Sequence, residues 1–268
     1  QVEGPNDGKG AVKREVTRVV TPGVRFEGDG LEDKSFNFLA AAVIGARETG
    51  AIAFVDVSTG NLRVRRVDSK EELLEALQRI QPSELILPST FMGVSTRDSL
   101  SSEGTDWLRQ VRNLGKAQGW HVVMRPFERL GRDRLDDRLE LFFRSSDVCA
   151  TASQVLSSLV PEELSPLGAV FDYVEELPVG RVPQFSQVVV EEQSKVALID
   201  YATCRNLEIL ETRNDSSKKY SLVGVIDSTQ TAMGARILRE WLTSPSSVRV
   251  EIEARHAAVA EFCEQADK

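Results

Sequence analysis

The sequence predicts an α/β domain with a mixed sheet, followed by a mostly helical region. Short apolar runs separated by turn residues fill the first half of the chain, and amphipathic helical patterns alternate with them. In the second half the spacing of apolar residues becomes helical almost throughout. The 268 residues, of which 41% are hydrophobic, suffice for one large core or two ordinary ones.

A β-hairpin is predicted near the start of the α/β part. Residues 51–57 form the apolar run of a buried strand, residues 58–61 form a turn, and residues 62–65 alternate as a half-exposed strand does. The alanine-rich run 36–44 before the hairpin is too short for its period to distinguish a strand from a helix. The hairpin therefore supplies the antiparallel part of the sheet.

Helices and strands alternate after the hairpin. Ser69 and Glu72 have the spacing of a capping box, and the apolar stripe that follows them stops before Pro82. Residues 84–87 and 120–124 are predicted strands, separated by a second helical stripe. Strands that alternate with helices form parallel crossovers, which makes the predicted sheet mixed.

Helices dominate the predicted second half. Helical apolar spacings occur at residues 135–142, 148–159, 167–174, 223–242 and 252–262. Pro245 is predicted to stop one of these helices, and residues 177–183, with two prolines and a glycine, are the best candidate for a linker.

Positive charge is concentrated near the N-terminus. Basic residues at positions 9, 13, 14 and 18 are interleaved with valines, ahead of a turn at Thr21-Pro22-Gly23. We predict a connecting strand with a solvated basic edge here, with phosphate contact as the less common alternative. The chain starts at Gln1 without a methionine, and no glycine or proline closes the amphipathic pattern that runs towards Lys268. We therefore expect a fragment of a longer protein.

Composition excludes several functional classes. With 33 Lys and Arg against 41 Asp and Glu, the net charge of −8 disfavours binding of duplex DNA by this segment alone. The longest apolar run is too short to span a membrane, and no secretory signal is recognisable, so neither a membrane nor a secreted location is expected. The cysteines at 149, 204 and 263 have no disulfide or zinc spacing, which fits a reducing cytosol.

Motifs for nucleotide or covalent chemistry are absent from the sequence. Gly8-Lys9 and Gly115-Lys116 lack both the upstream glycine and the following hydroxyl residue of a phosphate-binding loop, and no Gly-x-Ser-x-Gly elbow occurs. His121 and His256 have no cysteine or acidic cluster at ligand spacing, so packing or surface roles are expected. The sequence predicts no catalytic, cofactor-binding or metal-binding residues.

An acid, Asp56, lies inside the apolar strand 51–57. Ribonuclease-H-like nucleases place a metal-binding carboxylate at such a position, but their chemistry needs several acids around two metal ions. No second acid occurs in residues 86–87 or 120–124. A turn role for Asp56, bonded to residues 58–60, is the favoured interpretation, and a metal-dependent nuclease centred on Asp56 remains an alternative.

Two segments of the helical half carry a family resemblance. The first consists of Asp200, Thr203, Arg205, Asn206, Leu207 and Glu208, and the second of Asp227, Thr229, Thr231, Met233, Gly234, Arg236, Trp241 and Pro245. Their order and spacing resemble the start of the core domain of the MutS family of DNA mismatch repair proteins. Upstream, residues 12–23, Asp56-Val57-Ser58-Thr59-Gly60 and Pro82-Ser83-Glu84-Leu85 resemble that family's exit from the mismatch-binding domain and its connector domain.

The resemblance implies three parts. Residues 1–25 would lead out of a mismatch-binding domain that this sequence lacks, residues 26–158 would form a ribonuclease-H-like connector domain, and residues 159–268 would begin the helical core domain. It also favours a strand for residues 36–44. The family-motif residues have structural explanations, since Arg205 and Glu208 can pair on a helix and Thr231 or Asp227 can cap the next one.

The resemblance also implies a function without enzymatic chemistry in this chain. In the family, mismatched duplex DNA is bound by another domain, ATP and magnesium by a C-terminal domain of a dimeric protein, and a MutL-type partner by the connector. The expected locations are the bacterial cytoplasm and nucleoid or a eukaryotic nucleus. A stand-alone adaptor is a further alternative. The chain departs from the family at Cys204, usually arginine, and at Ser246, where leucine is common.

Overall fold

A computed structural model describes most of the chain. The described residues are 19–25, 36–45, 48–91, 94–95, 106–127, 132–143, 146–177, 184–191, 195–197, 199–215 and 217–266. The chain divides into two compact units: unit 1 comprises Gln1–Asp29, Asn37–Leu73 and Gln81–Val190, and unit 2 comprises Gly30–Phe36, Leu74–Ile80 and Glu191–Lys268. None of the described helices is long and apolar enough to cross a membrane.

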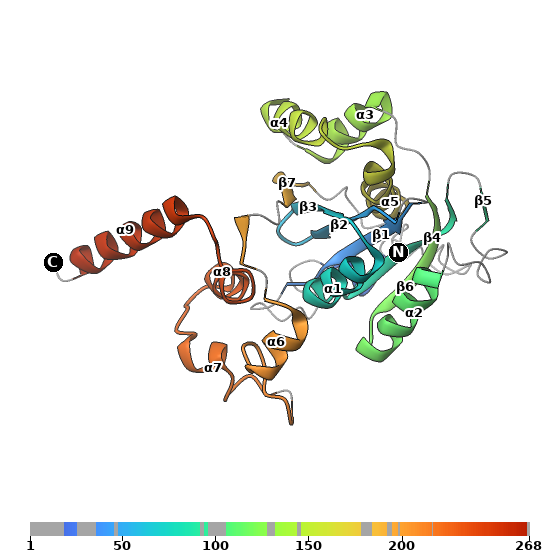
Figure 1. The fold of residues 1–268 in the computed structure, drawn as a ribbon. Helices are drawn as coiled ribbons and strands as arrows, with labels where there is room; N and C mark the ends of the chain where they lie inside the picture. The colour runs from blue at the N-terminus through green and yellow to red at the C-terminus, as the bar shows by residue number, and fades with distance from the viewer. Residues whose placement is uncertain are drawn as a thin grey trace, which may run out of the picture. The chain divides into compact units, whose positions relative to one another are not determined.

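Strands and helices alternate in the first two thirds of the chain (Figure 1). In chain order the elements are β1 (Leu39–Ile44), β2 (Gly50–Asp56), β3 (Asn61–Val67), α1 (Lys70–Ile80), β4 (Glu84–Phe91), β5 (Val94–Ser95), α2 (Asp106–Gln118), β6 (His121–Phe127), α3 (Arg132–Phe142), α4 (Ser146–Leu156), α5 (Pro161–Glu176) and β7 (Gln187–Glu191).

One mixed sheet contains all seven described strands. Their order is β5-β4-β1-β2-β3-β7, and β6 pairs with β4. Strands β1, β2 and β3 are antiparallel neighbours, with Leu39 of β1 opposite Val55 of β2. Strand β4 runs parallel to both β1 and β6. The predicted hairpin and mixed sheet are therefore confirmed, and the ambiguous run 36–44 contains strand β1.

Burial explains why the central strands read as unbroken apolar runs. Every residue of β1 and β2 is buried, so neither strand has a solvent face that would require polar alternation. Strand β3 is mixed. Leu62 and Val64 are buried on either side of the half-buried Arg63, but Arg65 is also buried, so the alternation predicted for residues 62–65 ends at Val64. The sequence pattern therefore records the position of each strand in the sheet.

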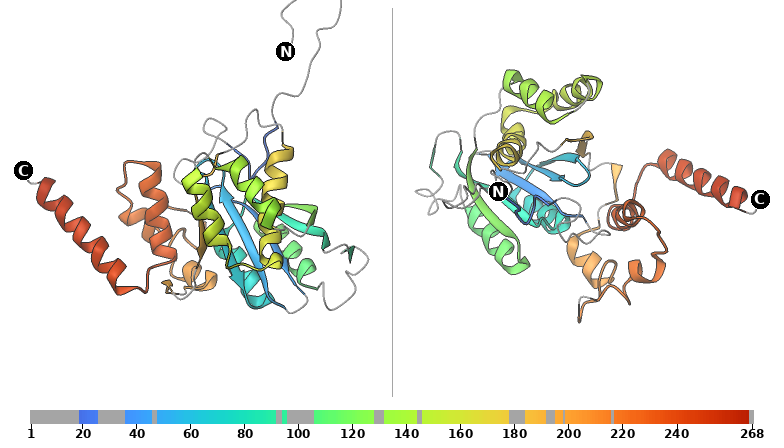
Figure 2. Two further views of the ribbon diagram at one scale, coloured as in Figure 1. Left: turned by 90° about the horizontal axis from the view of Figure 1, so that it is seen from above. Right: turned by 180° about the vertical axis from the view of Figure 1, so that it is seen from behind.

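Helix α5 covers β1 and β2. Figures 1 and 2 show α5, with α3 and α4, on one side of the sheet and α2 on the other. The buried face of α5 includes Leu167, Val170 and Phe171, none of them exposed to solvent. Phe142 of α3 stacks against Phe171 and Phe185, with ring centroids 4.8 and 5.1 Å apart. These aromatic rings join α3, α5 and the segment before β7 in one core.

The predicted domain boundary after residue 158 falls before α5, whereas unit 1 continues to Val190. Helical spacing assigned α5 to the helical half, because local periodicity does not reveal which surface a helix covers. Strand β7 lies in the half predicted as helical and joins the edge of the sheet beside β3. Within the predicted linker, residues 178–183 lie outside the described residues, as do the basic residues at 9, 13, 14 and 18.

Four helices occur among the described residues of unit 2 after residue 200. They are α6 (Tyr201–Asn206), α7 (Leu222–Ile226), α8 (Ala232–Thr243) and α9 (Arg249–Ala266). The helical spacing predicted over 223–242 corresponds to two helices, because the chain leaves the helical conformation at residues 227–231. Helix α8 ends just before Pro245, as the sequence predicts.

We expect the aromatic core to carry much of the stability of unit 1. Replacing Phe142 by alanine removes a fully buried ring and should lower the free energy of unfolding by about 3 to 5 kcal/mol in urea titrations followed by circular dichroism. The matched control is Phe262→Ala, because Phe262 is 72% exposed and should lose no more than about 0.5 kcal/mol. Similar losses for both variants would contradict this assignment of the core.

Candidate functional site

The motif from Asp56 to Gly60 forms the turn between β2 and β3. Asp56 is 1% exposed, and its Oδ1 accepts hydrogen bonds from the backbone N–H (3.0 Å) and the hydroxyl (2.6 Å) of Ser58. Its Oδ2 accepts the backbone N–H of Asn37 at 3.1 Å. The Thr59 hydroxyl donates to the Asp56 carbonyl oxygen at 3.1 Å. Asp56 therefore organises the turn, which is the interpretation that the sequence favours.

Gly60 makes this turn a contact point for a distant segment. Its φ of +71° lies in the left-handed region, and a Cβ there would lie 2.7 Å from the carbonyl oxygen of Gln184. The backbone N–H of Ser186 donates to the Gly60 carbonyl oxygen at 2.8 Å. The turn thus holds the segment that leads into β7, a contact that the sequence alone does not indicate.

The residues do not fit the metal or nucleotide chemistry considered from the sequence. In the described ranges, no group of three or more His, Cys, Asp or Glu side chains could hold a metal ion, and both oxygens of Asp56 accept hydrogen bonds, Oδ1 from Ser58 of the turn and Oδ2 from the Asn37 backbone N–H. Gly115 and Lys116 lie inside α2, where a Cβ on Gly115 would lie 2.8 Å from Cγ2 of Val122. A helix interior offers no free amides to hold a phosphate. No step through ATP or magnesium is therefore assigned to these residues.

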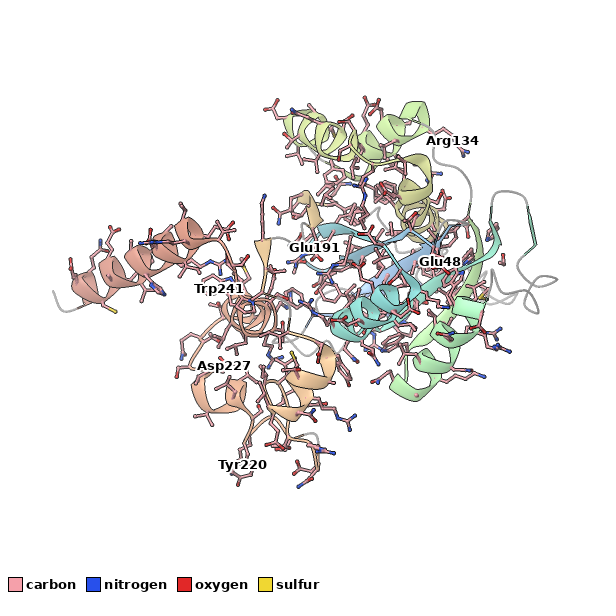
Figure 3. The ribbon with its side chains drawn as sticks, in the orientation of Figure 1. Glu48, Arg134, Glu191, Tyr220, Asp227 and Trp241 are labelled. Atoms are coloured by element: carbon pink, nitrogen blue, oxygen red, sulfur yellow. The ribbon has the colours of Figure 1, made fainter. Side chains whose placement is uncertain are left out.

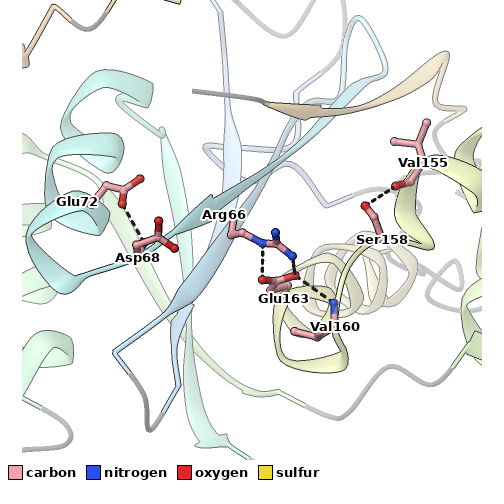
Figure 4. Close-up of polar contacts among 7 residues, drawn as sticks. All are labelled: Arg66, Asp68, Glu72, Val155, Ser158, Val160 and Glu163. Carbon is pink, nitrogen blue, oxygen red and sulfur yellow. Dashed lines mark hydrogen bonds and ion pairs between the residues drawn. The ribbon is translucent and has the colours of Figure 1, made fainter. Parts of the chain in front are cut away.

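An ion pair joins β3 to the start of α5 (Figure 4). Arg66 donates from Nε to Oε1 of Glu163 at 2.5 Å and from Nη2 to Oε2 at 2.8 Å. Oε2 also accepts the backbone N–H of Val160 at 3.0 Å, which satisfies an amide that the helix leaves unpaired. Hydrogen bonding to Glu163 raises the pKa of Arg66, so the guanidinium stays charged.

Two further arginines contact the C-terminal half of α5. Arg138 of α3 pairs with Asp172 at 2.6 Å and with Glu175. Arg125 of β6 pairs with Glu176 at 2.9 Å. Acidic residues of α5 therefore meet arginines from three elements, β3, α3 and β6. Single exposed pairs of this kind contribute little, but together they fix the orientation of a helix that apolar packing already holds.

Asp200 starts helix α6. Its Oδ1 accepts the backbone N–H of Thr203 at 2.5 Å, which is the geometry of an N-cap. This hydrogen bond lowers the pKa of Asp200. The Cys204 thiol lies 3.9 Å from the carbonyl oxygen of Ile199, and burial raises its pKa.

The sequence analysis expected Arg205 and Glu208 to pair on one helix, but the structure does not place them on the same helix. Helix α6 ends at Asn206, and Glu208 adopts a φ of +51° beyond it. The Glu208 carboxylate accepts the backbone N–H of Arg213 at 2.8 Å. Leu207, between Asn206 and Glu208, is 64% exposed. The short helix ends before the i, i+3 spacing is complete, so Glu208 instead organises the following loop.

In the second segment with the family resemblance, Asp227 and Thr231 make hydrogen bonds that define the end of α7 and the start of α8. Oδ1 of Asp227 accepts the backbone N–H (3.0 Å) and the hydroxyl (2.5 Å) of Thr229, which forms a turn after α7. The Thr231 hydroxyl oxygen accepts the backbone N–H of Gly234 at 3.1 Å and caps α8. Of the two caps considered from the sequence, Thr231 is the one that caps α8.

Three motif residues of α8 have different surroundings. Arg236 is buried, and its guanidinium carbon lies 5.9 Å from the ring centroid of Phe36. Trp241, labelled in Figure 3, is 41% exposed, and the guanidinium carbon of Arg255 of α9 lies 4.4 Å from its ring centroid. Met233 is 70% exposed. Arg236 and Trp241 therefore have packing roles within unit 2, whereas nothing in unit 2 explains Met233.

The turn at Pro245 leads into α9. The Pro245 carbonyl oxygen accepts the backbone N–H of Ala197 at 2.8 Å. Ser246, which the sequence analysis expected to depart from the family, donates its hydroxyl to Glu251 at 2.8 Å and accepts the backbone N–H of Val248 at 3.1 Å. Ser246 therefore has a polar role at the start of α9.

The sequence analysis predicted no contacts for two residues that make close ones. Glu84 is fully buried at the first position of β4, and Gly224 of α7 approaches the Lys218 carbonyl oxygen so closely that a Cβ would lie 1.8 Å from it. The signal for Glu84 was a charged residue at the start of the apolar run 84–87. Gly224 gave no local signal, because its neighbour comes from the preceding loop.

Comparisons with known proteins cover both units. The family model of MutS domain II matches residues 37–186, and that of MutS domain III matches residues 202–268. The DNA mismatch repair proteins MutS of Syntrophobacter fumaroxidans, Myxococcus xanthus and Symbiobacterium thermophilum are 31%, 33% and 35% identical over 98% to 99% of this chain. The chain spans 27% to 28% of the length of these relatives.

The N-cap of α6 should respond to acid. Because the pKa of Asp200 is lowered in the folded chain, its contribution to stability is present above the unfolded pKa, about 3.9, and is lost as the pH falls through the lower folded value. NMR should show the Thr203 amide losing its protection in that range. In the control Asp200→Asn, which keeps an acceptor without a titrating group, the Thr203 amide should not respond to acid. An acid response in both proteins would contradict the cap.

Proposed function

Because this chain belongs to the MutS family of DNA mismatch repair proteins, we propose that it forms the connector domain and the first part of the core domain of a mismatch repair ATPase. The observation that carries the proposal is the order of the two family matches, domain II on residues 37–186 and domain III on residues 202–268. The antiparallel β1–β3 meander followed by parallel β4 and β6 supports a ribonuclease-H-like arrangement for the connector. Its helix α5 belongs to the connector in this proposal.

The role we propose is transmission between a DNA-reading part and an ATP-hydrolysing part of the protein. Two buried acids have structural roles: Asp56 organises a turn and Glu163 anchors α5. A body whose elements are pinned in this way moves as one piece, which is the property that a transmitter needs. The chain itself then supplies no catalytic residue.

The partners of the proposed function follow from the family. Mismatched duplex DNA would be bound through another domain, a MutL-type protein through the connector, and a second subunit through the full-length protein. ATP and magnesium would be held outside this chain. The net charge of −8 supports the first point, because a surface that binds duplex DNA tightly by itself carries excess positive charge.

The chain alone should not distinguish mismatched from matched DNA. In low-salt titrations with labelled duplexes that differ by one G·T pair, we expect equal and weak binding, because the reading domain is not in this sequence and phosphate contacts carry no sequence information. A full-length relative serves as the positive control. Clear discrimination by the 268-residue chain would overturn the proposal that it transmits without reading.

The anchor of α5 should matter for transmission in the full-length protein. Arg66→Met removes the bidentate pair with Glu163, so we expect the mismatch-dependent change in ATP turnover to shrink while turnover without DNA stays constant. The matched control is Arg249→Met, since Arg249 is highly exposed and pairs only across one turn of α9. An unchanged mismatch response in Arg66→Met would count against transmission through α5.

A further inference from the structure

A fully buried carboxylate lies where the N-terminal segment meets the sheet. Glu84, the first residue of β4, has no exposed surface. Its Oε2 accepts the Thr21 hydroxyl at 2.5 Å and the Gly23 backbone N–H at 3.0 Å, and its Oε1 accepts the Tyr173 hydroxyl of α5 at 2.6 Å. His121 of β6 lies farther away, with Nε2 3.8 Å from Oε1. Three separate parts of unit 1 therefore share one side chain.

The N-terminal strap, residues 19–25, is fitted closely to this carboxylate. A Cβ on Gly23 would lie 2.7 Å from Cβ of Glu84 and 3.2 Å from Cα of Leu39, so a larger residue would push the strap away. Val24 is 1% exposed, and the Pro22 carbonyl oxygen accepts the side-chain amide of Asn37 at 3.0 Å. Figure 2 shows this dark blue segment beside α5. The Thr-Pro-Gly turn is thus a docked element.

Tyr173 extends the same contact to α5. The ring is 5% exposed, and the guanidinium carbon of Arg125 lies 5.4 Å from its centroid. Burial, with the hydrogen bond to Glu84 as a second cause, raises the pKa of Tyr173, so the hydroxyl stays a donor at neutral pH. The strap and the helix therefore donate to the two oxygens of one carboxylate.

The burial of Glu84 makes these donors interdependent. A carboxyl group with no exposed surface is tolerated only while hydrogen bonds satisfy its oxygens, and losing one donor leaves a buried polar atom unsatisfied. Withdrawal of the strap removes two of the three donors. Glu84 must then move or recruit water, and both changes disturb β4 and the Tyr173 contact.

We propose that Glu84 is a positioning residue that holds the N-terminal strap and passes a displacement of the strap to β4 and α5. Its role in repair rests on the proposed function, in which the chain before the strap comes from the DNA-reading part. The contact itself depends only on residues of unit 1. The two claims can therefore fail separately.

The test uses reciprocity between the strap and α5 in the 268-residue chain. Thr21→Val and Tyr173→Phe each remove one hydroxyl and keep the side-chain shape. We expect Tyr173→Phe to speed hydrogen exchange of the Gly23 amide about tenfold, and Thr21→Val to shift the resonances of Tyr173, as NMR would report. The controls are Tyr220→Phe and Thr151→Val. Tyr220 is 70% exposed, and the exposed Thr151 hydroxyl donates to the Asp147 carbonyl oxygen, so neither hydroxyl bonds to the buried Glu84.

A pair of glycine substitutions tests the strap without removing any hydrogen-bonding group. Gly23→Ala should speed exchange of the Val24 amide and alter the Tyr173 resonances, because its Cβ would collide with Glu84. The control is Gly119→Ala, because a Cβ there meets nothing within 4 Å and adds only the strain of its φ of +76°. It should leave the exchange of the Val24 amide and the Tyr173 resonances unchanged. Circular dichroism identifies any variant that fails to fold.

The outcomes separate the two proposals. Effects confined to the mutated element in Thr21→Val, Tyr173→Phe and Gly23→Ala would overturn the positioning role of Glu84, whatever the chain does in repair. Reciprocal effects support it. If these effects appear but the chain discriminates mismatched DNA by itself, the proposed function fails and the role of Glu84 remains.

Discussion

The packing of helix α5 on strands β1 and β2 is the interaction on which unit 1 depends. Both strands are buried along their whole length, so the sheet needs a cover on each face. Helix α5 supplies one cover with side chains such as Phe171 and Val170, and the aromatic rings of Phe142 and Phe185 extend it. This apolar contact decides where the surrounding charged residues must lie.

Charged residues then fix α5 in one orientation. Arg66 from β3, Arg138 from α3 and Arg125 from β6 meet acids at the two ends of the helix, and Glu84 from β4 meets its Tyr173. Apolar packing tolerates small shifts, whereas bidentate and buried hydrogen bonds do not. In the proposed function, this arrangement would let a displacement of α5 reach the strands that these residues join.

Unit 2 is built differently. Its short helices are defined by caps at Asp200, Ser221 and Thr231, and large apolar side chains such as Val225, Met233 and Phe262 are 70% to 74% exposed. Local hydrogen bonds can specify such helices without a large core, because each cap satisfies amides that a helix end leaves unpaired. This is why the family segments of unit 2 consist largely of cap and turn residues.

The sequence by itself determined the features that depend on local patterns. These are the hairpin, the alternation of strands and helices, the turn role of Asp56, and the Thr231 cap, together with the family. The tertiary structure decided which unit α5 joins, where β7 pairs, and that Glu84 meets Thr21 and Tyr173. Periodicity reports that a helix has an apolar face, and spacing reports that a cap is available. Neither periodicity nor spacing reports which distant surface or buried side chain a residue will contact. Such contacts join residues 61 to 97 positions apart, as the hydrogen bonds of Glu84 and Glu163 do, and only the folded chain brings these residues together.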